Sequence, residues 1–378
     1  MQKLMMHFLS LKKLPKSARE FMECCLPYIE TDVTDDFESM MHMVMSGGTL
    51  ILGSGFGREG ILLDTRTYPA RTTAEPEGDR VMRGSRDGFV ETLVMNTALI
   101  RRRIRDPRLT MEHFSLGGSS ETDVVVCYMN ELADKETVDE VKRKISSIRP
   151  KSLTLGYQSL AESLIRSGWY NPFPKIRTTE RPDTAAAQLL EGSVIVICDT
   201  SPQAMILPTS IFDYLEETDD YCFPPLTGTY LRLVRTAILL LSVVITPLWY
   251  LSLEYDAILP DALSFLVPDD PGALPIILQL FLVELAIDGL KIASMNTPDI
   301  LSNSLSVVGG LILGDFAVGV GWLIPEVIIL MAFVAIANFS QRSYELGYAF
   351  KFMRILLLIS VALFGLWGFF GGVVLIIA

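Results

Sequence analysis

Residues 236–253 read TAILLLSVVITPLWYLSL, a stretch without a charged side chain. A helix needs roughly 20 mostly apolar residues to cross the hydrocarbon core of a bilayer, and this stretch approaches that length. Further apolar segments follow it at residues 274–292, 305–321, 327–339 and 355–378. The sequence therefore predicts an α-helical polytopic membrane domain over residues 229–378, with about five membrane segments.

The residues before this block have the mixed composition of a water-soluble α/β protein. Short apolar runs predict strands, and segments with helical spacing lie between them. We expect a helical lead-in over residues 1–33, a first small α/β lobe over 34–150 and a second over 151–228. The expected fold is an α/β head of two lobes followed by the membrane domain.

The charge and the cysteines exclude several classes of protein. The 378 residues carry a net charge of −12, whereas a nucleic-acid-binding protein needs a basic face, so we expect no nucleic acid among the partners. The five cysteines and three histidines lack metal-ligand spacing, and the odd, scattered cysteines are typical of reduced thiols inside a cell. No catalytic motif is found. We therefore expect no enzymatic activity, no cofactor and no metal.

GFGREG, residues 55–60, matches the bare glycine fingerprint of dinucleotide-binding proteins. That fingerprint requires a helix directly after the glycines, with its N-terminus at the pyrophosphate. A short run of isoleucine and leucine follows here instead, so we interpret the glycines as the turn of a β-hairpin.

An arginine run, RRRIR at residues 101–105, ends a helix predicted over residues 88–104. Cations at a helix C-terminus complement the helix dipole, so a solvated last turn is the simplest interpretation. The alternative is a contact with anionic lipid headgroups or with an acidic neighbouring subunit. Membrane lipids are expected partners of the apolar segments in either case.

The positions of Lys and Arg predict the orientation of the membrane domain, because these residues are retained on the cytoplasmic side. The loop 254–273 contains five acidic residues and no Lys or Arg. A five-segment topology places the cations of the block on the opposite side from this loop; they are Arg232, Arg235, Lys291, Arg342, Lys351 and Arg354. The head is therefore expected in the cytoplasm.

Acidic residues lie within the apolar segments at Glu284, Asp288 and Asp315. Glu284 is near the middle of its segment, where an ionised carboxylate is costly and usually faces a cavity or a charged partner. Asp288 and Lys291 have the spacing to pair with each other near the inner interface.

Small residues recur at helical spacing through the third segment, at Ser306, Gly310, Gly314, Ala317 and Gly321. One interpretation of this stripe is tight packing between helices, and the other is a helix that faces a pore or a neighbouring subunit. The last segment carries Gly368, Gly371 and Gly372 and has the glycines for a hairpin. Because it ends at Ala378 without a polar flank, we expect the sequence to be truncated there.

Two blocks of the head resemble characteristic motifs of the GerA-type spore germination proteins, the A-subunit family of germinant receptors. The first is VMRGSRDGF at residues 81–89, and the second is NPFPKIRTTERPD at residues 171–183. The motif positions are Arg83, Gly84, Arg86, Gly88, Asn96, Asn171, Pro172, Pro174, Glu180, Arg181, Pro182, Asp183, Glu191 and Gly192. DTSP at 199–202 and LPDAL at 259–263 are most similar to the stage V sporulation protein AF branch of that family.

The resemblance implies a multi-pass protein of the spore inner membrane with its N-terminal head in the spore core. It implies a homo-oligomer around a pore that releases cations during germination, with other germination membrane proteins as partners and no catalytic residues. The acidic loop 254–273 fits a channel, because it would concentrate cations at the mouth. The alternative is a non-conducting scaffold that clusters or stabilises germinant receptors.

Overall fold

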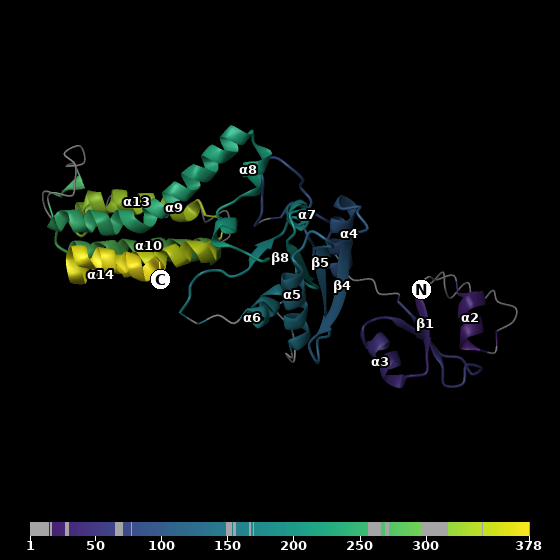
Figure 1. The fold of residues 1–378 in the computed structure, drawn as a ribbon. Helices are drawn as coiled ribbons and strands as arrows, with labels where there is room; N and C mark the ends of the chain where they lie inside the picture. The colour runs from purple at the N-terminus through teal and green to yellow at the C-terminus, as the bar shows by residue number, and fades with distance from the viewer. Residues whose placement is uncertain are drawn as a thin grey trace. The chain divides into compact units, whose positions relative to one another are not determined.

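The computed structural model describes residues 15, 17–26, 30–64, 71–76, 78–148, 153, 156–165, 168, 170–255, 266–268, 272–296, 317–341 and 343–377. The chain divides into two compact units, Met1–Arg71 and Thr72–Ala378, and Figure 1 shows the elements of both.

The described residues of the first unit form a three-stranded antiparallel sheet and two helices. Its elements are α2 Ala18–Cys25, β1 Thr31–Thr34, α3 Phe37–Met45, β2 Thr49–Ile51 and β3 Gly60–Leu63, and the strand order is β1-β3-β2. Phe21 of α2 packs on Ile61 and Leu63 of β3. Each helix begins where a side-chain oxygen caps it, at Ser17 and Asp36.

Strands β2 and β3 pair as an antiparallel hairpin, with Ile51 opposite Ile61. Gly57 in the connecting turn has a φ of +65°, a conformation that glycine adopts without strain. The interpretation of GFGREG as a turn is therefore confirmed. The expected helical lead-in differs from the structure, because residues 31–34 form β1 and pair with β3.

The second unit contains a five-stranded sheet with antiparallel pairing between neighbours. Its strands are β4 Leu109–Leu116, β5 Thr122–Met129, β6 Arg177–Thr179, β7 Val194–Cys198 and β8 Ala204–Leu207, in the order β4-β5-β7-β8-β6. The central strands β5 and β7 pair from Val124 opposite Cys198 to Cys127 opposite Ile195. Both contain unbroken apolar runs, as strands covered on both faces do.

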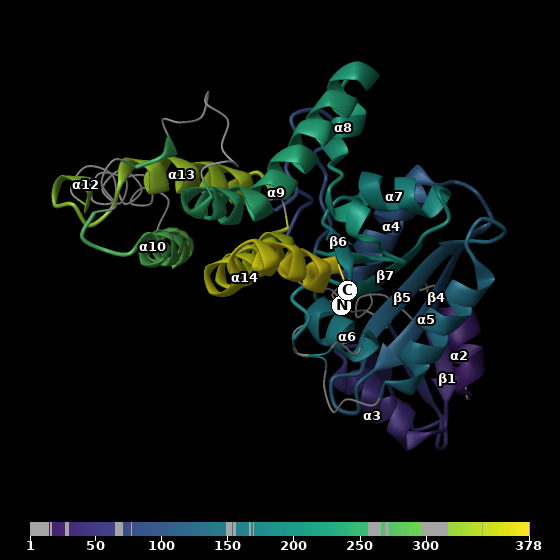
Figure 2. The ribbon, with the colours of Figure 1, turned by 60° about the vertical axis from the view of Figure 1, so that its left-hand side comes forward.

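Helices cover both faces of this sheet (Figure 2). On one face, α4 Leu93–Arg103 and α7 Pro182–Leu190 pack on alternate residues of the central strands, among them Val125 and Ile195. On the other face, α5 Lys135–Ser147 and α6 Tyr157–Leu164 pack on the intervening residues, among them Val126 and Val196. The head is thus an α/β layer structure with a core on each side of the sheet.

The expected division into two lobes at residue 150 differs from this arrangement. β4 and β5 come from the expected first lobe, whereas β6, β7 and β8 come from the second, and all five strands belong to one sheet. The compact unit that does separate ends at Arg71. The helix expected over residues 88–104 begins only at Leu93, because residues 78–92 form a loop.

The described residues that follow this sheet are mainly helical. After the short helices η1 Ile211–Tyr214 and α8 Thr218–Cys222 come α9 Pro225–Glu254, α10 Ile276–Asn296, α12 Ala317–Gly319, α13 Pro325–Phe339 and α14 Tyr344–Ile377. Trp249 of α9 and Leu280 of α10 pack with Val327 and Val334 of α13 and Leu358 of α14 in one apolar core. The predicted helical C-terminal domain is confirmed.

The number of membrane segments is supported only in part. Among the described helices, α9 and α14 are each long and apolar enough to cross a membrane, and α13 is apolar but has 15 residues. α10 has the length but carries Glu284, Asp288 and Lys291. Most of the expected third segment, residues 305–316, lies outside the described residues.

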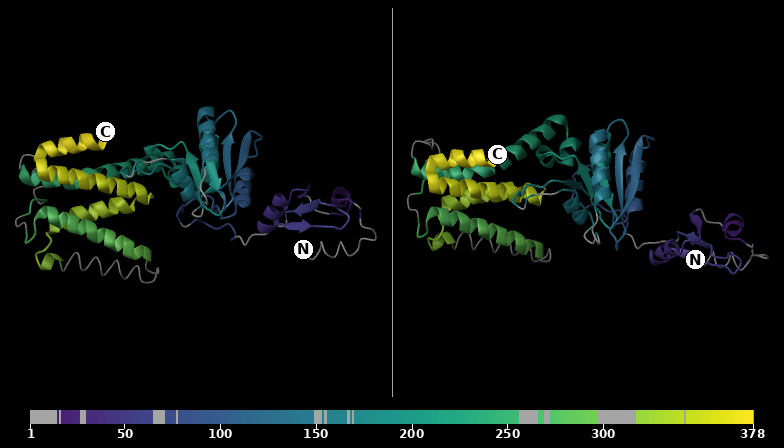
Figure 3. Two further views of the ribbon diagram at one scale, coloured as in Figure 1. Left: turned by 90° about the horizontal axis from the view of Figure 1, so that it is seen from below. Right: turned by 60° about the horizontal axis from the view of Figure 1, so that its bottom comes forward.

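Helix α14 is a hairpin of two arms (Figure 3). Its backbone leaves the helical conformation at Gly365, where φ is 56° and ψ is −134°. A Cβ atom added at Gly368 would overlap the carbonyl oxygen of Ser360, and one at Gly372 would lie 2.7 Å from Cδ1 of Leu357. The expected hairpin is present, but the chain reverses at Gly365. Gly368 and Gly372 allow the two arms to pack closely.

Alanine at Gly368 and at Gly371 should change stability in opposite directions. Gly368→Ala forces a methyl group against the Ser360 carbonyl and should lower the free energy of unfolding by about 1–3 kcal/mol. Gly371 has nothing within 4 Å of its Cβ position, so Gly371→Ala should raise that free energy by about 0.5–1 kcal/mol through helix propensity. Thermal unfolding in detergent measures both, and equal shifts of one sign would contradict the close packing of the arms.

Candidate functional site

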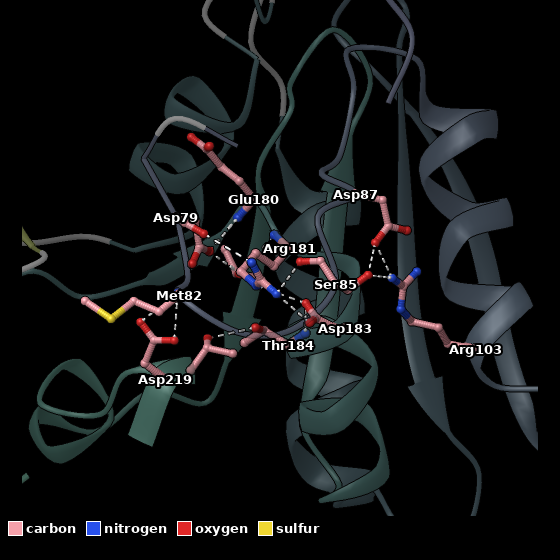
Figure 4. A network of polar contacts seen from close by, with 12 residues as sticks. Asp79, Met82, Ser85, Asp87, Arg103, Glu180, Arg181, Asp183, Thr184 and Asp219 are labelled. Carbon is pink, nitrogen blue, oxygen red and sulfur yellow. Dashed lines mark hydrogen bonds and ion pairs between the residues drawn. The ribbon is translucent and has the colours of Figure 1, made fainter. Parts of the chain in front are cut away.

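Arg181 is fully buried and holds the loop 78–89 against the start of α7 (Figure 4). Its Nη2 donates to the carbonyl oxygen of Ser85 at 2.8 Å and to Oδ2 of Asp183 at 2.6 Å, and its Nε donates to Oδ1 of Asp183 at 3.1 Å. A buried guanidinium is stable only where its donors meet acceptors and its charge meets a carboxylate. This side chain therefore joins the two blocks that the sequence singled out.

The loop is also tied to the second block at Asp79 and Phe89. Oδ2 of Asp79 accepts from the hydroxyl of Thr179 at 2.8 Å and from the backbone N–H of Glu180 at 3.2 Å. The N–H of Phe89 donates to the carbonyl of Glu180 at 2.8 Å. The side chain of Glu180 accepts from Nε2 of Gln203 at 3.0 Å. Both ends of the loop are thus fixed to residues 179–181.

The start of α7 explains why the second block has its sequence. Pro182 occupies the first helical turn, where a missing N–H costs nothing, and Asp183 places a negative charge at the positive end of the helix. Asp183 also supplies both carboxylate oxygens that accept from Arg181. Helix initiation and charge compensation are therefore combined in one residue.

The arginine run at the end of α4 is used inside the head at two positions. Arg103 donates to Oδ1 of Asp87 at 2.5 Å and to the hydroxyl of Ser85 at 2.9 Å. Burial alone would raise the pKa of Asp87, but the hydrogen bonds from Arg103 and Ser85 outweigh it and lower that pKa. Arg101 donates to the carbonyl of Leu109 at 2.9 Å. These two cations therefore hold the loop 78–89 and β4 through hydrogen bonds within the head.

The glycines of the motifs stand where a side chain would not fit. A Cβ at Gly88 would lie 2.8 Å from the carbonyl oxygen of Ala74. Gly84 has a φ of +132° and Gly192 one of +97°, a region that L-residues rarely adopt. A Cβ at Gly192 would also lie 2.7 Å from the carbonyl oxygen of Leu132.

The remaining motif residues are mostly structural. The fully buried Asn96 accepts from the N–H of Val90 at 2.8 Å and donates to its carbonyl at 2.6 Å. Arg83 lies 5.8 Å from the centroid of the Phe223 ring. Glu191 accepts from Gln188 just after α7. Arg86 makes no hydrogen bond or ion pair within the described part of the chain.

The bend NPFP, with Pro172 and Pro174, brings the head to the helices. Oδ1 of Asn171 accepts from the N–H of Phe173 at 3.0 Å, which closes the turn. The ring of Phe173 lies 6.3 Å from the ring of Phe350 in α14, edge to face. Phe173 also packs against Leu239 and Val243 of α9 through a shared apolar cluster.

Helix α8 connects the loop 78–89 to α9. The N–H of Met82 donates to the carboxylate of Asp219 at 3.1 Å, and the hydroxyls of Thr184 and Thr218 lie 3.1 Å apart. A Cβ at Gly228 of α9 would overlap the carbonyl oxygen of Asp220, so α8 and α9 are in direct backbone contact.

Arg235 of α9 completes this connection. It pairs with Asp220 at 2.8 Å and with Glu217 at 3.0 Å, and it donates to the carbonyl of Leu215 at 3.1 Å. Asp220 is buried. Arg232, one turn earlier, pairs with Glu216 at 3.0 Å. The cations expected to flank the first membrane segment are therefore bound to acids of the head.

A second charge cluster lies among helices α9, α10 and α14. Arg354 of α14 pairs with Glu284 of α10, and Lys351 pairs with Asp288 and lies 3.5 Å from Glu284. Nη1 of Arg354 also donates to the carbonyl oxygen of Ser242 in α9 at 3.4 Å. Arg354 is 2% exposed and Glu284 is 8% exposed. Two acids and two cations thus compensate one another.

This cluster corrects two expectations. Lys351 and Arg354 lie within the first arm of α14, not before its helix, and pair with the acids of α10. Asp288 pairs with Lys351 rather than with Lys291, whose Nζ lies 4.5 Å from the ring centroid of Tyr344. The sequence does contain a signal for this pairing. Glu284 and Asp288 are four residues apart and Lys351 and Arg354 are three apart, so each pair lies on one face of its helix.

The stripe of small residues is described only at its end. Ser306, Gly310, Gly314 and Asp315 lie outside the described residues. Ala317 belongs to the short helix α12, and Gly321 follows it with a φ of +77°. The N–H of Gly321 donates to the carbonyl of Val318 at 2.9 Å. Gly321 therefore ends a helix and does not continue the stripe along one.

The cysteines are free, and three of them, Cys25, Cys127 and Cys198, are buried. Burial raises the pKa of the Cys127 and Cys198 thiols to about 12, so both stay protonated and unreactive. Within the described ranges, no group of three or more His, Cys, Asp or Glu side chains could hold a metal ion.

The chain is similar to known proteins over nearly all of its length. The family model of the Bacillus/Clostridium GerA spore germination protein covers residues 1–378. Stage V sporulation protein AF of Bacillus subtilis is 39% identical over 97% of this chain and 74% of its own length. Spore germination protein B1 of the same species is 28% identical over 94% of this chain and 75% of its own length.

Among solved structures, the N-terminal domain of the A subunit of the Bacillus megaterium spore germinant receptor GerK3 is similar in sequence. It is 31% identical and covers 33% of this chain and 97% of that domain, with a TM-score of 0.27.

A double-mutant cycle on Glu284 and Arg354 should show strong coupling. Glu284→Gln leaves the buried Arg354 without its acid and should lower the free energy of unfolding by about 3–5 kcal/mol. Arg354→Met leaves Glu284 with Lys351 alone at 3.5 Å and should cost somewhat less. The double variant should lose much less than the sum of the two. Equilibrium unfolding in detergent gives all four values.

The matched control is the exposed pair of Glu140 and Lys144 on α5. The same cycle there should give a coupling energy of about 0.5 kcal/mol or less. Additive losses at Glu284 and Arg354 would contradict the buried cluster.

Proposed function

The chain belongs to the GerA family of spore germination proteins, and we propose from this that it is a membrane subunit of a germination complex. In this proposal several copies surround a pore that releases cations during germination. Its partners in this proposal are other germination membrane proteins, because the relatives are sporulation and spore germination proteins by name. The protein spans the spore inner membrane several times, and its head faces the spore core.

The observation that carries this proposal is the connection between the head and the helices. A membrane anchor needs only a long apolar helix. Here Arg235 of α9 also forms an ion pair with the buried Asp220 of α8, and α8 accepts a hydrogen bond from Met82 of the loop 78–89. A rearrangement of that loop would therefore be transmitted to α9, which is long enough to cross a membrane. Gating requires such a connection between a control domain and a membrane helix.

The helices also have surface for assembly. Large apolar side chains stay exposed along α9, α10 and α14, among them Leu240, Leu285, Phe352 and Trp367. Such surface faces either lipid or the helices of a neighbouring copy. A pore built from several copies would take its lining from these faces or from the segment that carries Gly310 and Gly314.

A non-conducting scaffold is the second candidate function. The observation in its favour is the compensation of Glu284 and Asp288 by Arg354 and Lys351, because these acids then attract no cation. In that case the head and the helices would cluster other germination proteins without forming a pore.

Reconstitution in liposomes separates the two functions. The channel proposal expects cation flux from the purified chain and a mass in detergent that corresponds to an oligomer. Gly310→Leu should abolish the flux or the assembly, because a bulky residue interrupts the small-residue stripe. Ile312→Phe, on the opposite face of the predicted helix, should keep most of the flux.

A monomer without flux, or a Gly310→Leu variant that conducts like the natural chain, would contradict the channel proposal. An oligomer without flux would favour the scaffold.

A further inference from the structure

The loop 78–89 is held in place on both sides of Arg86, although Arg86 itself has no partner in the described part of the chain. Arg103 donates to the hydroxyl of Ser85 at 2.9 Å and to Oδ1 of Asp87 at 2.5 Å (Figure 4). The backbone on each side of Arg86 is therefore fixed, while the Arg86 side chain is exposed. A side chain presented from a fixed backbone loses less conformational entropy when it binds a partner.

The end of α4 places two more arginines beside this loop. Arg102 lies in the last turn of α4 next to Arg103, and Arg105 follows the helix. Both are exposed, and neither has a hydrogen bond or ion pair with a described residue. The acids next to these arginines in sequence are already paired with other arginines. Arg86, Arg102 and Arg105, named the cationic surface below, therefore carry positive charge that the described head does not compensate.

Large apolar side chains are exposed on the two elements that carry the cationic surface. They are Met82 in the loop and Val94 and Met95 on α4. Arginine, methionine and apolar side chains together are typical of surfaces that bind another protein, since a solvated face needs only the charges.

The headgroups of the bilayer lie too far away to be the partner in the proposed topology. Arg83 of the loop lies 5.8 Å from the ring centroid of Phe223, just before α9 begins. Residues 225–235 of α9 precede the apolar stretch and form about 16 Å of helix. The headgroup layer on each side of a bilayer is only about 5–8 Å thick. The cationic surface therefore fits an acidic protein better than an anionic lipid.

The first unit of the chain has a surface of the opposite charge. Residues 30–38 read ETDVTDDFE, with five acids and no Lys or Arg. All five acids are exposed, and none forms an ion pair within the described ranges. Phe37, Met41 and Met45 of α3 are exposed as well, and their spacing of four residues places them on one side of the helix. Residues 30–38 and this side of α3, named the acidic surface below, match the cationic surface in charge and in apolar character.

We propose that the cationic surface of one copy binds the acidic surface of a second copy. This inference rests on the proposed function, in which several copies surround a pore. A closed ring needs two different and complementary surfaces on every copy, because each contact joins unlike surfaces of two neighbours. Opposite charges favour the correct pairing, and the exposed methionines and Phe37 contribute apolar area that the contact removes from water.

Charge reversal on each surface of the full chain tests this contact. One variant carries Arg86→Glu and Arg102→Glu, and the other carries Asp35→Lys and Glu38→Lys. Each variant alone brings like charges together, so its oligomer should dissociate at a protein concentration at least about tenfold higher than the natural oligomer does. Light scattering in detergent over a series of protein concentrations measures the mass.

Mixing the two variants should restore the oligomer. In the mixture, the glutamates of the first variant meet the lysines of the second, and the unchanged surfaces of the two variants meet each other. A contact that forms inside each chain would not be restored by mixing. A chain with all four substitutions should also assemble like the natural chain, which shows that neither reversal prevents folding.

Arg143→Glu is the matched control. Arg143 is exposed on α5, which covers the opposite face of the sheet from α4, and its reversal should leave the association unchanged.

Natural-like association of both reversed variants would overturn the inference, and so would association that is lost in each variant and not restored by mixing. An oligomeric natural chain whose mass neither reversal changes would leave the channel proposal in place, whereas a monomeric natural chain would contradict both. The two proposals can therefore fail separately.

Discussion

The need to compensate buried arginine side chains determines how the second unit is built. Arg181 and Arg354 are almost fully buried, and the side chain of Arg235 is 13% exposed. A guanidinium removed from water costs several kcal/mol unless carboxylates and carbonyls meet its donors. Each of these arginines therefore fixes the position of its partners, and each lies where segments distant in sequence meet.

The three sites form a series from the head into the helices. Arg181 fixes the loop 78–89 on α7, and that loop contacts α8 through Met82 and Asp219. Asp220 of α8 holds Arg235 of α9, and α9 in turn accepts from Arg354 through the carbonyl of Ser242. Glu284 then brings α10 into the same set. In the proposed function, this series of contacts would couple the head to the helices, which gating or regulated assembly requires.

Local patterns predicted the elements of the fold better than their pairing. Short apolar runs predicted strands in the head, and β7 and β8 are such runs. The division at residue 150 was misplaced because pairing of β5 with β7 joins residues about 70 apart, and no local signal reports such a contact. The motif blocks were found by resemblance, but their meeting at Arg181 depends on tertiary structure. The sequence predicts Arg354 as a flanking cation, because a cation near the end of an apolar run has the same local pattern whether it faces water or a buried acid.

Hydrogen exchange on the full chain with Arg181→Met tests most directly whether the buried arginines link the head to the helices. Amide protection reports local opening, so the variant should lose protection in the loop 78–89, in α8 and in the first turns of α9. Arg108→Met, which removes an exposed cation paired with Asp106, should change protection only near its own site. Loss of protection confined to the loop and α7, with α8 and α9 unchanged, would contradict the account.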